Sequence, residues 1–351
     1  MDITKIDFLK TSTFDYLLPK ELIAQDPVEP RDSSRLLVLH RDSGVIEHER
    51  FKDIKTHLIE GDLLVLNDTR VLPARVTGIK KNGNAKVEIF FLSPSSEPRK
   101  WTALVRPGRK LNEGTNVLLG DDEEVTIGER LDDGVRNVYF NSSYDPLEII
   151  HKYGQTPFPH YITESHAEPE QYQTVYSKHE KENSVASPTA GLHFTEELLR
   201  EIRSKGVDVA FVTLQVGLGT FRPVKTDNIC DHIMHNEICE VSEVTAQKIK
   251  EAQKRAGRVI AVGTTVVRTL ESFAAQYGEV IPGMLDTRLF ITPGYNFKVI
   301  DALITNYHLP KSTLLMLVSA FGGYDKVMEA YKEAVNLRYR FFSFGDSMFI
   351  C

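Results

Sequence analysis

The chain has 351 residues, of which 41% are apolar and 26% are charged, and its formal net charge is −7. This length predicts about two domains of roughly 150 residues each, and the composition excludes the fibrous, collagen-like and disordered classes. The acidic net charge argues against a protein that coats nucleic acid by charge alone.

The cellular location can also be inferred from the sequence. Cys230, Cys239 and Cys351 are too few and too unevenly spaced for a disulfide framework, which favours a reducing, cytoplasmic location. The first ten residues mix charged and apolar side chains, so we expect no signal peptide. The longest apolar stretch, residues 314–321, is far shorter than the roughly 20 residues that cross a bilayer, so we expect no membrane span.

The first apolar runs, residues 36–39 and 62–67, are predicted to be buried strands. Residues 71–140 then show almost only strand patterns, separated by turns rich in Gly, Asn, Asp and Pro. The predicted strands are 71–79, 86–92, 101–105, 116–119, 124–127 and 135–140. Short strands without a helical period between them predict a small closed or nearly closed β-barrel of about 80 residues.

From residue 145 onward the pattern changes to alternating helices and strands. Thr195 and Ser242 are predicted N-caps of two helices, which end near Gly206 and Gly257. The strands that follow are predicted at 207–216 and 258–262. A third helix is predicted to start at 263–265, with a strand at 288–291 after it.

Such alternation predicts an α/β fold with a largely parallel sheet covered by helices. The runs at 36–39 and 62–67 have no helical neighbours in the barrel region, so we assign them to this sheet. The predicted architecture is a larger, helix-covered α/β catalytic domain, split into 1–66 and 146–351, with a small all-β barrel domain inserted at 67–145.

The charge is unevenly distributed along the chain. Residues 70–110 hold ten Lys and Arg but only Glu88 and Glu97, a local charge of 10 − 2 = +8, so the remainder carries −7 − 8 = −15. One interpretation is a solvated basic face of the barrel. The other is a surface that binds a phosphate backbone, a common use of small barrels.

Two segments place backbone amides where an anion could bind. Residues 187–194 precede the helix capped by Thr195 and include Gly191 and His193. Residues 262–268 run from strand to turn to helix, which puts Thr264 and Thr265 at a helix N-terminus with Arg268 one turn further.

Two further segments combine polar and small residues. Gly217 and Gly219, followed by Thr220, lie after a strand and would let a ligand approach the backbone, but they do not form a dinucleotide fingerprint. Strand alternation would put His235, Glu237 and Cys239 on one face. Their spacing is unlike the usual zinc patterns, which leaves hydrogen bonding to a substrate as the favoured role.

Residues 302–313 end an apolar strand in the polar tip Asn306, Tyr307 and His308, and ligands lie at such strand ends in α/β sheets. Residues 338–348 interleave Arg338 and Arg340 with aromatic side chains, and Asp346 follows. This interleaving suits stacking on nucleic-acid bases, although a core strand at the C-terminus explains the aromatic residues equally well.

Together these segments resemble the S-adenosylmethionine:tRNA ribosyltransferase-isomerase family of queuosine biosynthesis. The resemblance spans essentially the whole chain and rests on residues 14–19, 67–75, 188–194, 217–221, 262–265, 306–310 and 344–348. One departure lies at 156–161, where a pair of adjacent prolines is expected before Tyr161.

The resemblance implies an α/β domain that carries an inserted barrel, and a specific reaction. The ribosyl part of S-adenosylmethionine is transferred and isomerised onto 7-aminomethyl-7-deazaguanine at the tRNA wobble position, giving epoxyqueuosine-tRNA, adenine and methionine. S-adenosylmethionine is then a co-substrate, and we expect no true cofactor, no metal and a monomeric enzyme.

This chemistry requires particular groups. The sulfonium acidifies the neighbouring 5′ C–H bonds, so a base must act where water is excluded, and departing adenine needs an acid. We hypothesise that His193 or His308 is the base or acid and that Asp346 holds a cation or the substrate's amine. The other predicted substrate contacts are Gly263, Thr264, Thr265 and Arg268 for the methionine carboxylate, with Gly191, Gly217, Gly219, Thr220, His235, Glu237, Asn306 and Tyr307. The predicted tRNA contacts are Arg70, Arg75, Arg106, Arg109, Arg338 and Arg340.

Two alternatives come from other functional classes. An S-adenosylmethionine-dependent RNA methyltransferase would need a glycine-rich loop that opens a helix after the first strand, and the Gly217 region does not provide one. A non-enzymatic RNA-binding protein would explain the basic residues but not the histidine-bearing loops.

Overall fold

A computed structural model describes residues 6–120, 122–217 and 224–351. It divides into two compact units. The first comprises Met1–Thr69, His160–Lys181 and Ser187–Cys351, and the second comprises Arg70–Pro159 and Glu182–Ala186. The larger unit is therefore split in sequence by the smaller one.

The smaller unit extends beyond the predicted range of 67–145. Helix α2 (Pro146–Tyr153) and strand β11 (Gly154–Gln155) belong to it because β11 pairs with the barrel strand β5. Strand β12 (Glu182–Ser184) also belongs to it, through its pairing with β4 (Arg70–Val71).

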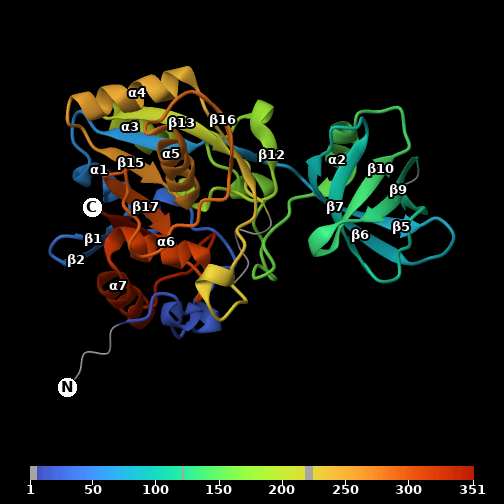
Figure 1. Cartoon of the computed structure of the whole chain (residues 1–351), viewed down its shortest axis with the longest axis horizontal. Helices are drawn as coiled ribbons and strands as arrows, with labels where there is room; N and C mark the ends of the chain where they lie inside the picture. The colour runs from blue at the N-terminus through green and yellow to red at the C-terminus, as the bar shows by residue number, and fades with distance from the viewer. Residues whose placement is uncertain (1–5, 121, 218–223) are drawn as a thin grey trace. The chain divides into compact units, whose positions relative to one another are not determined.

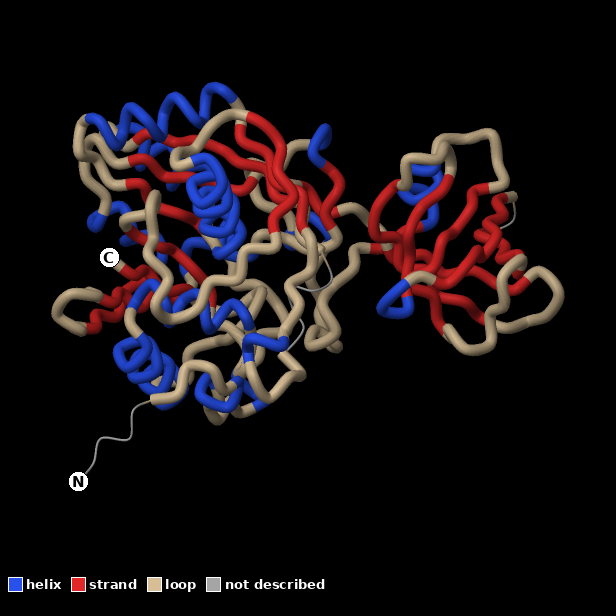
Figure 2. Tube along the Cα trace, in the orientation of Figure 1, coloured by secondary structure: helices blue, strands red, loops and turns tan. Residues whose placement is uncertain are grey.

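The described part of the smaller unit contains a closed antiparallel barrel (Figures 1 and 2). Its strands are β5 (Arg75–Lys80), β6 (Lys86–Pro94), β7 (Lys100–Arg106), β8 (Thr115–Leu119), β9 (Glu123–Arg130) and β10 (Val135–Phe140). Pairing of Ile79 with Leu118 joins β5 to β8 and closes the ring. A Cβ at Gly78 would lie 2.5 Å from the Leu118 carbonyl oxygen, so this close approach requires glycine.

The core of the barrel follows the alternation in its sequence. Along β6, Val87, Ile89 and Phe91 are buried, while Glu88 and Phe90 between them are only partly buried. Side chains alternate across a strand, so one set fills the interior and the other faces outward. The predicted small barrel is confirmed.

The larger unit is built on a mixed sheet with the order β16-β14-β13-β3-β15-β17-β18-β1-β2 among the described residues. Its strands are β1 (Arg35–Leu39), β2 (Ile46–Arg50), β3 (Leu63–Asn67), β13 (Asp208–Leu214), β14 (Glu237–Val241), β15 (Val259–Val262), β16 (Gly283–Thr287), β17 (Ala302–Asn306) and β18 (Ser347–Ile350). The two early apolar runs join this sheet as β1 and β3, as predicted.

The sheet contains more antiparallel strand pairs than the sequence predicted. Strands β13, β3, β15 and β17 are parallel neighbours, but β14 and β16 pair antiparallel at one side and β17 pairs antiparallel with β18. Strands β16 and β18 each follow a helix along the chain, as parallel strands do, so the alternation of helices and strands could not reveal their antiparallel pairing. The α/β class with an inserted barrel is confirmed.

Helices cover this sheet (Figure 1). They are α1 (Ile54–His57), α3 (Glu196–Ser204), α4 (Glu243–Lys254), α5 (Thr264–Tyr277), α6 (Thr313–Gly322) and α7 (Tyr324–Asn336). The predicted caps Thr195 and Ser242 accept hydrogen bonds from Leu198 N and Thr245 N, and Ser312 caps α6 in the same way. Leu198, Leu199 and Ile202 of α3 pack into a buried apolar cluster with strand residues such as Leu64 and Ile260, whereas α4 and α5 pack against β13, β3 and β15 outside that cluster.

One predicted strand is wrong. The strand lies at Gly283–Thr287, not at 288–291. Strand β16 is an edge strand with several exposed side chains, so its apolar pattern is weak. Leu289, Phe290 and Ile291 are apolar for another reason, because they line a cavity described below.

Candidate active site

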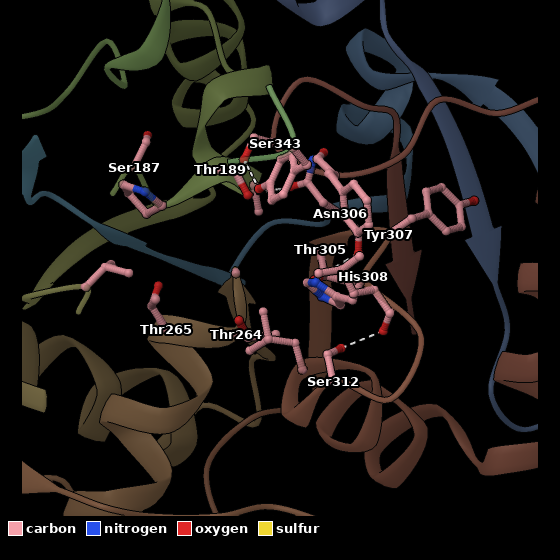
Figure 3. A pocket seen from close by; sticks show the side chains of 18 residues that line it. Ser187, Thr189, Thr264, Thr265, Thr305, Asn306, Tyr307, His308, Ser312 and Ser343 are labelled. Atoms are coloured by element: carbon pink, nitrogen blue, oxygen red, sulfur yellow. Dashed lines mark hydrogen bonds between the residues drawn. The ribbon is translucent and has the colours of Figure 1, made fainter. Parts of the chain in front are cut away.

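A cavity lies at the carboxyl ends of strands β15 and β17 (Figure 3), the edge of an α/β sheet where ligands bind. We call it the first cavity. Residues 187–190, 263–265, 305–309 and 342–343 line it, together with Tyr161, Val216, Ser312 and Leu314. Figure 3 shows Thr264 and Thr265 on one side of it and Thr305, Asn306 and His308 on another. Segments far apart in the sequence therefore meet here.

Unsatisfied polar atoms mark this cavity as a binding site. Among the described residues, the side-chain oxygens of Ser187, Thr265 and Tyr307 are buried without a hydrogen-bond partner, and all three residues line the first cavity. Buried polar groups in native proteins are nearly always bonded. A ligand with several polar groups would supply the missing partners.

The N-terminus of α5 opens into the first cavity. Gly263, the N-cap, has φ +90° and ψ 153°, a conformation that is essentially restricted to glycine. This turn presents Thr264 and Thr265 at the start of a 14-residue helix. The unpartnered hydroxyl of Thr265 and the partial positive charge of the helix end both favour an anionic or hydroxyl-bearing ligand group.

His308 is the histidine that lines the first cavity. Its Nε2 lies 2.9 Å from Thr305 Oγ1, and Thr305 Oγ1 donates to the Asn306 carbonyl oxygen at 3.4 Å. Because that carbonyl can only accept, His308 Nε2 carries the proton and Nδ1 keeps a lone pair. Nδ1 has no hydrogen-bond partner among the described residues. Burial lowers the pKa of His308 to about 3, so the ring is neutral at physiological pH.

His193 does not line the first cavity but lies behind Asn306. The Asn306 amide nitrogen donates to the Phe342 carbonyl at 3.1 Å and lies 3.2 Å from His193 Nε2, so Nε2 accepts. The His193 proton is then on Nδ1, which donates to Ser34 Oγ at 2.8 Å. Burial, with smaller contributions from nearby arginines, lowers the pKa of His193 to about 3. Both ring nitrogens are occupied by protein groups.

Asp346 is also occupied by protein groups. It is 2% exposed and accepts from the Arg35 backbone N–H at 2.9 Å, from Arg35 Nε at 3.1 Å and from the Arg340 backbone N–H at 2.8 Å. The carboxylate therefore ties the start of β1 to the turn before β18. It does not line the first cavity.

A second cavity lies on the other side of Leu314, which lines both cavities. We define it by its polar residues His232, His235, Glu237 and Arg268. Arg268 and Glu237 are 5% and 4% exposed and form an ion pair. Strand β14 begins at Glu237, so His235 lies before it and does not share its strand face, contrary to the prediction.

The structure thus separates the predicted carboxylate site into two parts. Gly263, Thr264 and Thr265 line the first cavity, while Arg268, one turn along α5, lines the second. Of the other predicted substrate contacts, Asn306 and Tyr307 line the first cavity. Gly217 donates its N–H to Glu237 Oε1 at 3.0 Å.

The remaining predicted contacts have other surroundings. Gly191 packs against Tyr176, whose hydroxyl oxygen would lie 2.0 Å from a Cβ at that position. Gly219 and Thr220 lie outside the described residues.

The sequence analysis did not identify several of the lining residues. Tyr161 and Ser343 come from distant segments and bond to each other, with Tyr161 Oη 2.7 Å from Ser343 Oγ. Thr189 Oγ1 donates to Asn306 Oδ1 at 3.3 Å. These residues lie in segments that the sequence analysis named, at 156–161, 187–194 and 338–348, but nothing else in the sequence distinguishes them from their neighbours.

The predicted tRNA-binding arginines differ in availability. Arg106, Arg109 and Arg338 are exposed. Arg70 pairs with Glu182 at 3.8 Å, and Arg75 Nη2 donates to the Phe158 carbonyl at 3.2 Å. Arg340 is half-buried and donates to the Asp26 carbonyl.

A wider groove of about 680 Å³ lies along β13 and α4, and four of its charged groups already pair with one another. Lys178 bonds to Asp68 at 3.1 Å and Lys181 pairs with Glu240. The unsatisfied hydroxyls therefore favour the first cavity as the active site.

No cluster of three or more potential metal ligands occurs in the described ranges, and no helix there is long and apolar enough to span a membrane.

Comparison with known proteins gives consistent matches over the whole chain. Residues 11–350 match the family model described as "Queuosine biosynthesis protein". The S-adenosylmethionine:tRNA ribosyltransferase-isomerase of Carboxydothermus hydrogenoformans is 52% identical over 344 residues, covering 97% of this chain and 100% of the relative. The protein of the same name from Symbiobacterium thermophilum is 51% identical over 343 residues, with the same coverage. The crystal structure of S-adenosylmethionine tRNA ribosyltransferase from Thermotoga maritima matches with 43% identity and a TM-score of 0.57, covering 96% of this chain and 99% of that one.

Proposed function

The chain belongs to the queuosine biosynthesis protein family, and we propose that it transfers and isomerises the ribosyl moiety of S-adenosylmethionine onto 7-aminomethyl-7-deazaguanine at the wobble position of tRNA. The products are epoxyqueuosine-tRNA, adenine and methionine. We expect it to act as a cytoplasmic monomer, with S-adenosylmethionine as co-substrate and without a resident cofactor.

The observation that carries this proposal is the first cavity itself. It combines unpartnered hydroxyls of Ser187, Thr265 and Tyr307 with an imidazole whose Nδ1 is available as an acceptor. Ribose hydroxyls and purine nitrogens have the hydrogen-bonding groups that these side chains lack. The arrangement suits a polar nucleoside held where water is largely excluded.

His308 is the proposed base for the 5′ proton. Removal of this proton gives a carbanion next to the sulfonium, and the electron pair of the former C–H bond stays on the 5′ carbon. His308 Nδ1 can accept the proton because Thr305 holds the Nε2 proton. A ring that is neutral before the reaction is also compatible with the positive sulfonium beside it.

His193 is proposed as a positioning residue rather than a group that touches substrate. It holds the Asn306 amide, which lines the first cavity together with Tyr307. Asp346 is proposed to fix the turn that carries Phe342 and Ser343, because it accepts from the Arg340 N–H. Departing adenine requires a proton donor, and we assign this role to His308, which carries the abstracted proton after the first step.

The tRNA is proposed to contact the basic residues between 70 and 110, with Arg106 and Arg109 as the exposed members. Arg70, Arg75, Arg338 and Arg340 remain proposed contacts. Of these, Arg70, Arg75 and Arg340 would have to exchange or share a protein acceptor with a phosphate.

The first test identifies the products. The protein is incubated with labelled S-adenosylmethionine and tRNA that carries 7-aminomethyl-7-deazaguanine. Release of adenine and methionine supports the proposal. S-adenosylhomocysteine would indicate a methyltransferase, and binding of the tRNA without any product would indicate a non-enzymatic RNA-binding protein.

The second test addresses the base. His308→Ala is expected to lower kcat on the order of 10²- to 10⁴-fold, the usual contribution of a proton-transfer group. His193→Ala should lower kcat less, because it only releases Asn306. His57→Ala is the matched control, since His57 pairs with Glu49 away from the cavities. Wild-type kcat in both His308→Ala and His193→Ala would refute the acid–base assignment.

A further inference from the structure

The roles proposed for the residues of the first cavity do not involve the second cavity. Helix α5 links it to the first cavity, since Thr264 and Thr265 line the first and Arg268 lines the second. Leu314 of α6 borders both. A ligand that occupies both cavities would therefore lie along Leu314 and reach Arg268.

Arg268 has hydrogen-bonding capacity to spare in this cavity. Its Nε donates to the Leu289 carbonyl at 3.2 Å, and its Nη1 bonds to Glu237 Oε2. Its Nη2 is buried without a partner among the described residues. An arginine that is 5% exposed and leaves donors unused has a large desolvation cost, which an anionic ligand group would offset.

Glu237 supplies the opposite charge at the same place. It is 4% exposed, its Oε2 faces Arg268, and its Oε1 accepts from the Gly217 N–H at 3.0 Å. The negative charge of this carboxylate would also attract an ammonium group, and each of its oxygens has two lone-pair sites. The pair thus offers both donors for an anion and acceptors for a cation.

A zwitterionic α-amino acid fits this pair better than a simple anion does. In an α-amino acid the carboxylate and the ammonium are attached to the same carbon. The charges of Arg268 and Glu237 are also adjacent, so each ligand charge can lie next to a side chain of opposite charge. A carboxylate can bind a guanidinium in a two-pronged geometry, which the unpartnered Nη2 permits. Phe290, Ile291 and Leu317 add an apolar wall that suits a methylene chain.

We propose that the second cavity binds the α-amino-acid end of S-adenosylmethionine, with the carboxylate on Arg268 and the ammonium on Glu237. This inference rests on the proposed function for the identity of the ligand. It divides the substrate between two cavities, with the nucleoside in the first. It also makes Glu237 a specificity-determining residue, because it selects a ligand with an ammonium group beside the carboxylate.

The test compares two ligands by isothermal calorimetry on the full chain, without tRNA. The ligands are S-adenosylmethionine and decarboxylated S-adenosylmethionine, which lacks only the carboxylate. The wild-type protein is expected to bind S-adenosylmethionine at least tenfold more tightly. Arg268→Gln should bring the ratio of the two dissociation constants close to one. Glu237→Gln should weaken both ligands, since both keep the ammonium.

Two further variants separate recognition from folding. Removing one partner of a buried ion pair destabilises a protein strongly, whereas removing both leaves no unpaired charge. The double variant Arg268→Gln/Glu237→Gln should therefore fold and still lose the tenfold preference. Arg258→Gln is the matched control. It breaks another ion pair, 2.6 Å from the fully buried Asp62 near the start of β15, and should lower the melting temperature but keep the preference.

The outcomes separate this inference from the proposed function. An unchanged preference in folded Arg268→Gln and in the double variant would overturn the amino-acid site, even if adenine is released in the turnover assay. A preference that depends on Arg268, in a protein that releases no adenine, would support the site and refute the ribosyl transfer. A wild-type protein that binds the two ligands equally would also overturn the site.

Discussion

At the scale of single residues, burial decides what each histidine can do. His193 and His308 are both enclosed, and burial lowers the pKa of each to about 3. Their difference lies in hydrogen bonding, because His193 bonds through both ring nitrogens and His308 through Nε2 alone. Of the two, only His308 lines the first cavity and keeps a ring nitrogen without a hydrogen bond to a described residue.

The depressed histidine pKa values predict how stability depends on pH. An unfolded histidine titrates near pH 6.5. Below that pH the unfolded chain binds protons that the folded chain does not bind, so the free energy of unfolding decreases as the pH falls from about 6.5 toward about 3. Above pH 6.5 these two groups cause no change.

Chemical denaturation at several pH values between 7.5 and 5 measures this effect. His193→Gln should make the free energy of unfolding depend less on pH, because glutamine does not titrate. The slope should fall by an amount that corresponds to up to about one bound proton. His166→Gln is the control, since His166 is exposed. Equal slopes in His193→Gln and wild type would contradict the prediction.

At the scale of elements, α5 organises both cavities. Its first turn lines the first cavity and Arg268, one turn later, lines the second, so one helix sets the spacing between the two cavities. Glycines with positive φ begin and end this helix, Gly263 at +90° and Gly278 at +84°. Their positions make them a matched pair for testing the role of the N-terminus.

Gly263→Ala and Gly278→Ala are both expected to destabilise the protein, the first by about 1–3 kcal/mol and the second by about 1–2 kcal/mol, because a Cβ disfavours these conformations. A Cβ at Gly278 meets nothing within 4 Å, so its effect stays local. Only Gly263→Ala should weaken S-adenosylmethionine binding, by tenfold or more. Thermal melts and calorimetry would show this, and equal binding by the two variants would argue against an anchoring role for the α5 N-terminus.

At the scale of the whole molecule, the net charge hides the proposed nucleic-acid surface. The sum of −7 averages the +8 of residues 70–110 with the −15 of the remainder, and the ten acids of residues 111–150 lie in the other half of the barrel sequence. Arg106 ends β7 and pairs with Glu88 at 3.9 Å, Arg109 and Lys110 follow the strand, and all three are exposed. A negative protein can thus bind RNA through one basic segment.

The dependence of tRNA affinity on salt tests this role. Replacing Arg106, Arg109 and Lys110 by Gln should reduce the slope of log Kd against log salt by about 2–3, at roughly 0.7–0.9 per phosphate contact. Replacing Lys52, Arg200 and Lys254, which are exposed in the larger unit, is the control for net charge. If the tRNA affinity of the wild type did not change with salt, the proposed phosphate contacts would be refuted. The basic residues would then form only a solvated face of the barrel.

The sequence by itself determined the local features of this protein. Thr195 and Ser242 cap helices, the alternating strands form a barrel, and the residues 263–265 and 306–308 line the first cavity. Each of these depends on neighbours in sequence, such as a side chain that bonds a backbone N–H three residues later or an apolar period of two.

The tertiary structure decided which polar side chains face the cavities. His193 turned toward Ser34 and Asn306, Asp346 toward Arg35, and Arg268 toward Glu237. These partners lie between 31 and 311 residues apart in the chain. Because a buried charge or imidazole must find a partner wherever the fold brings one, its role depends on long-range packing that no local pattern specifies.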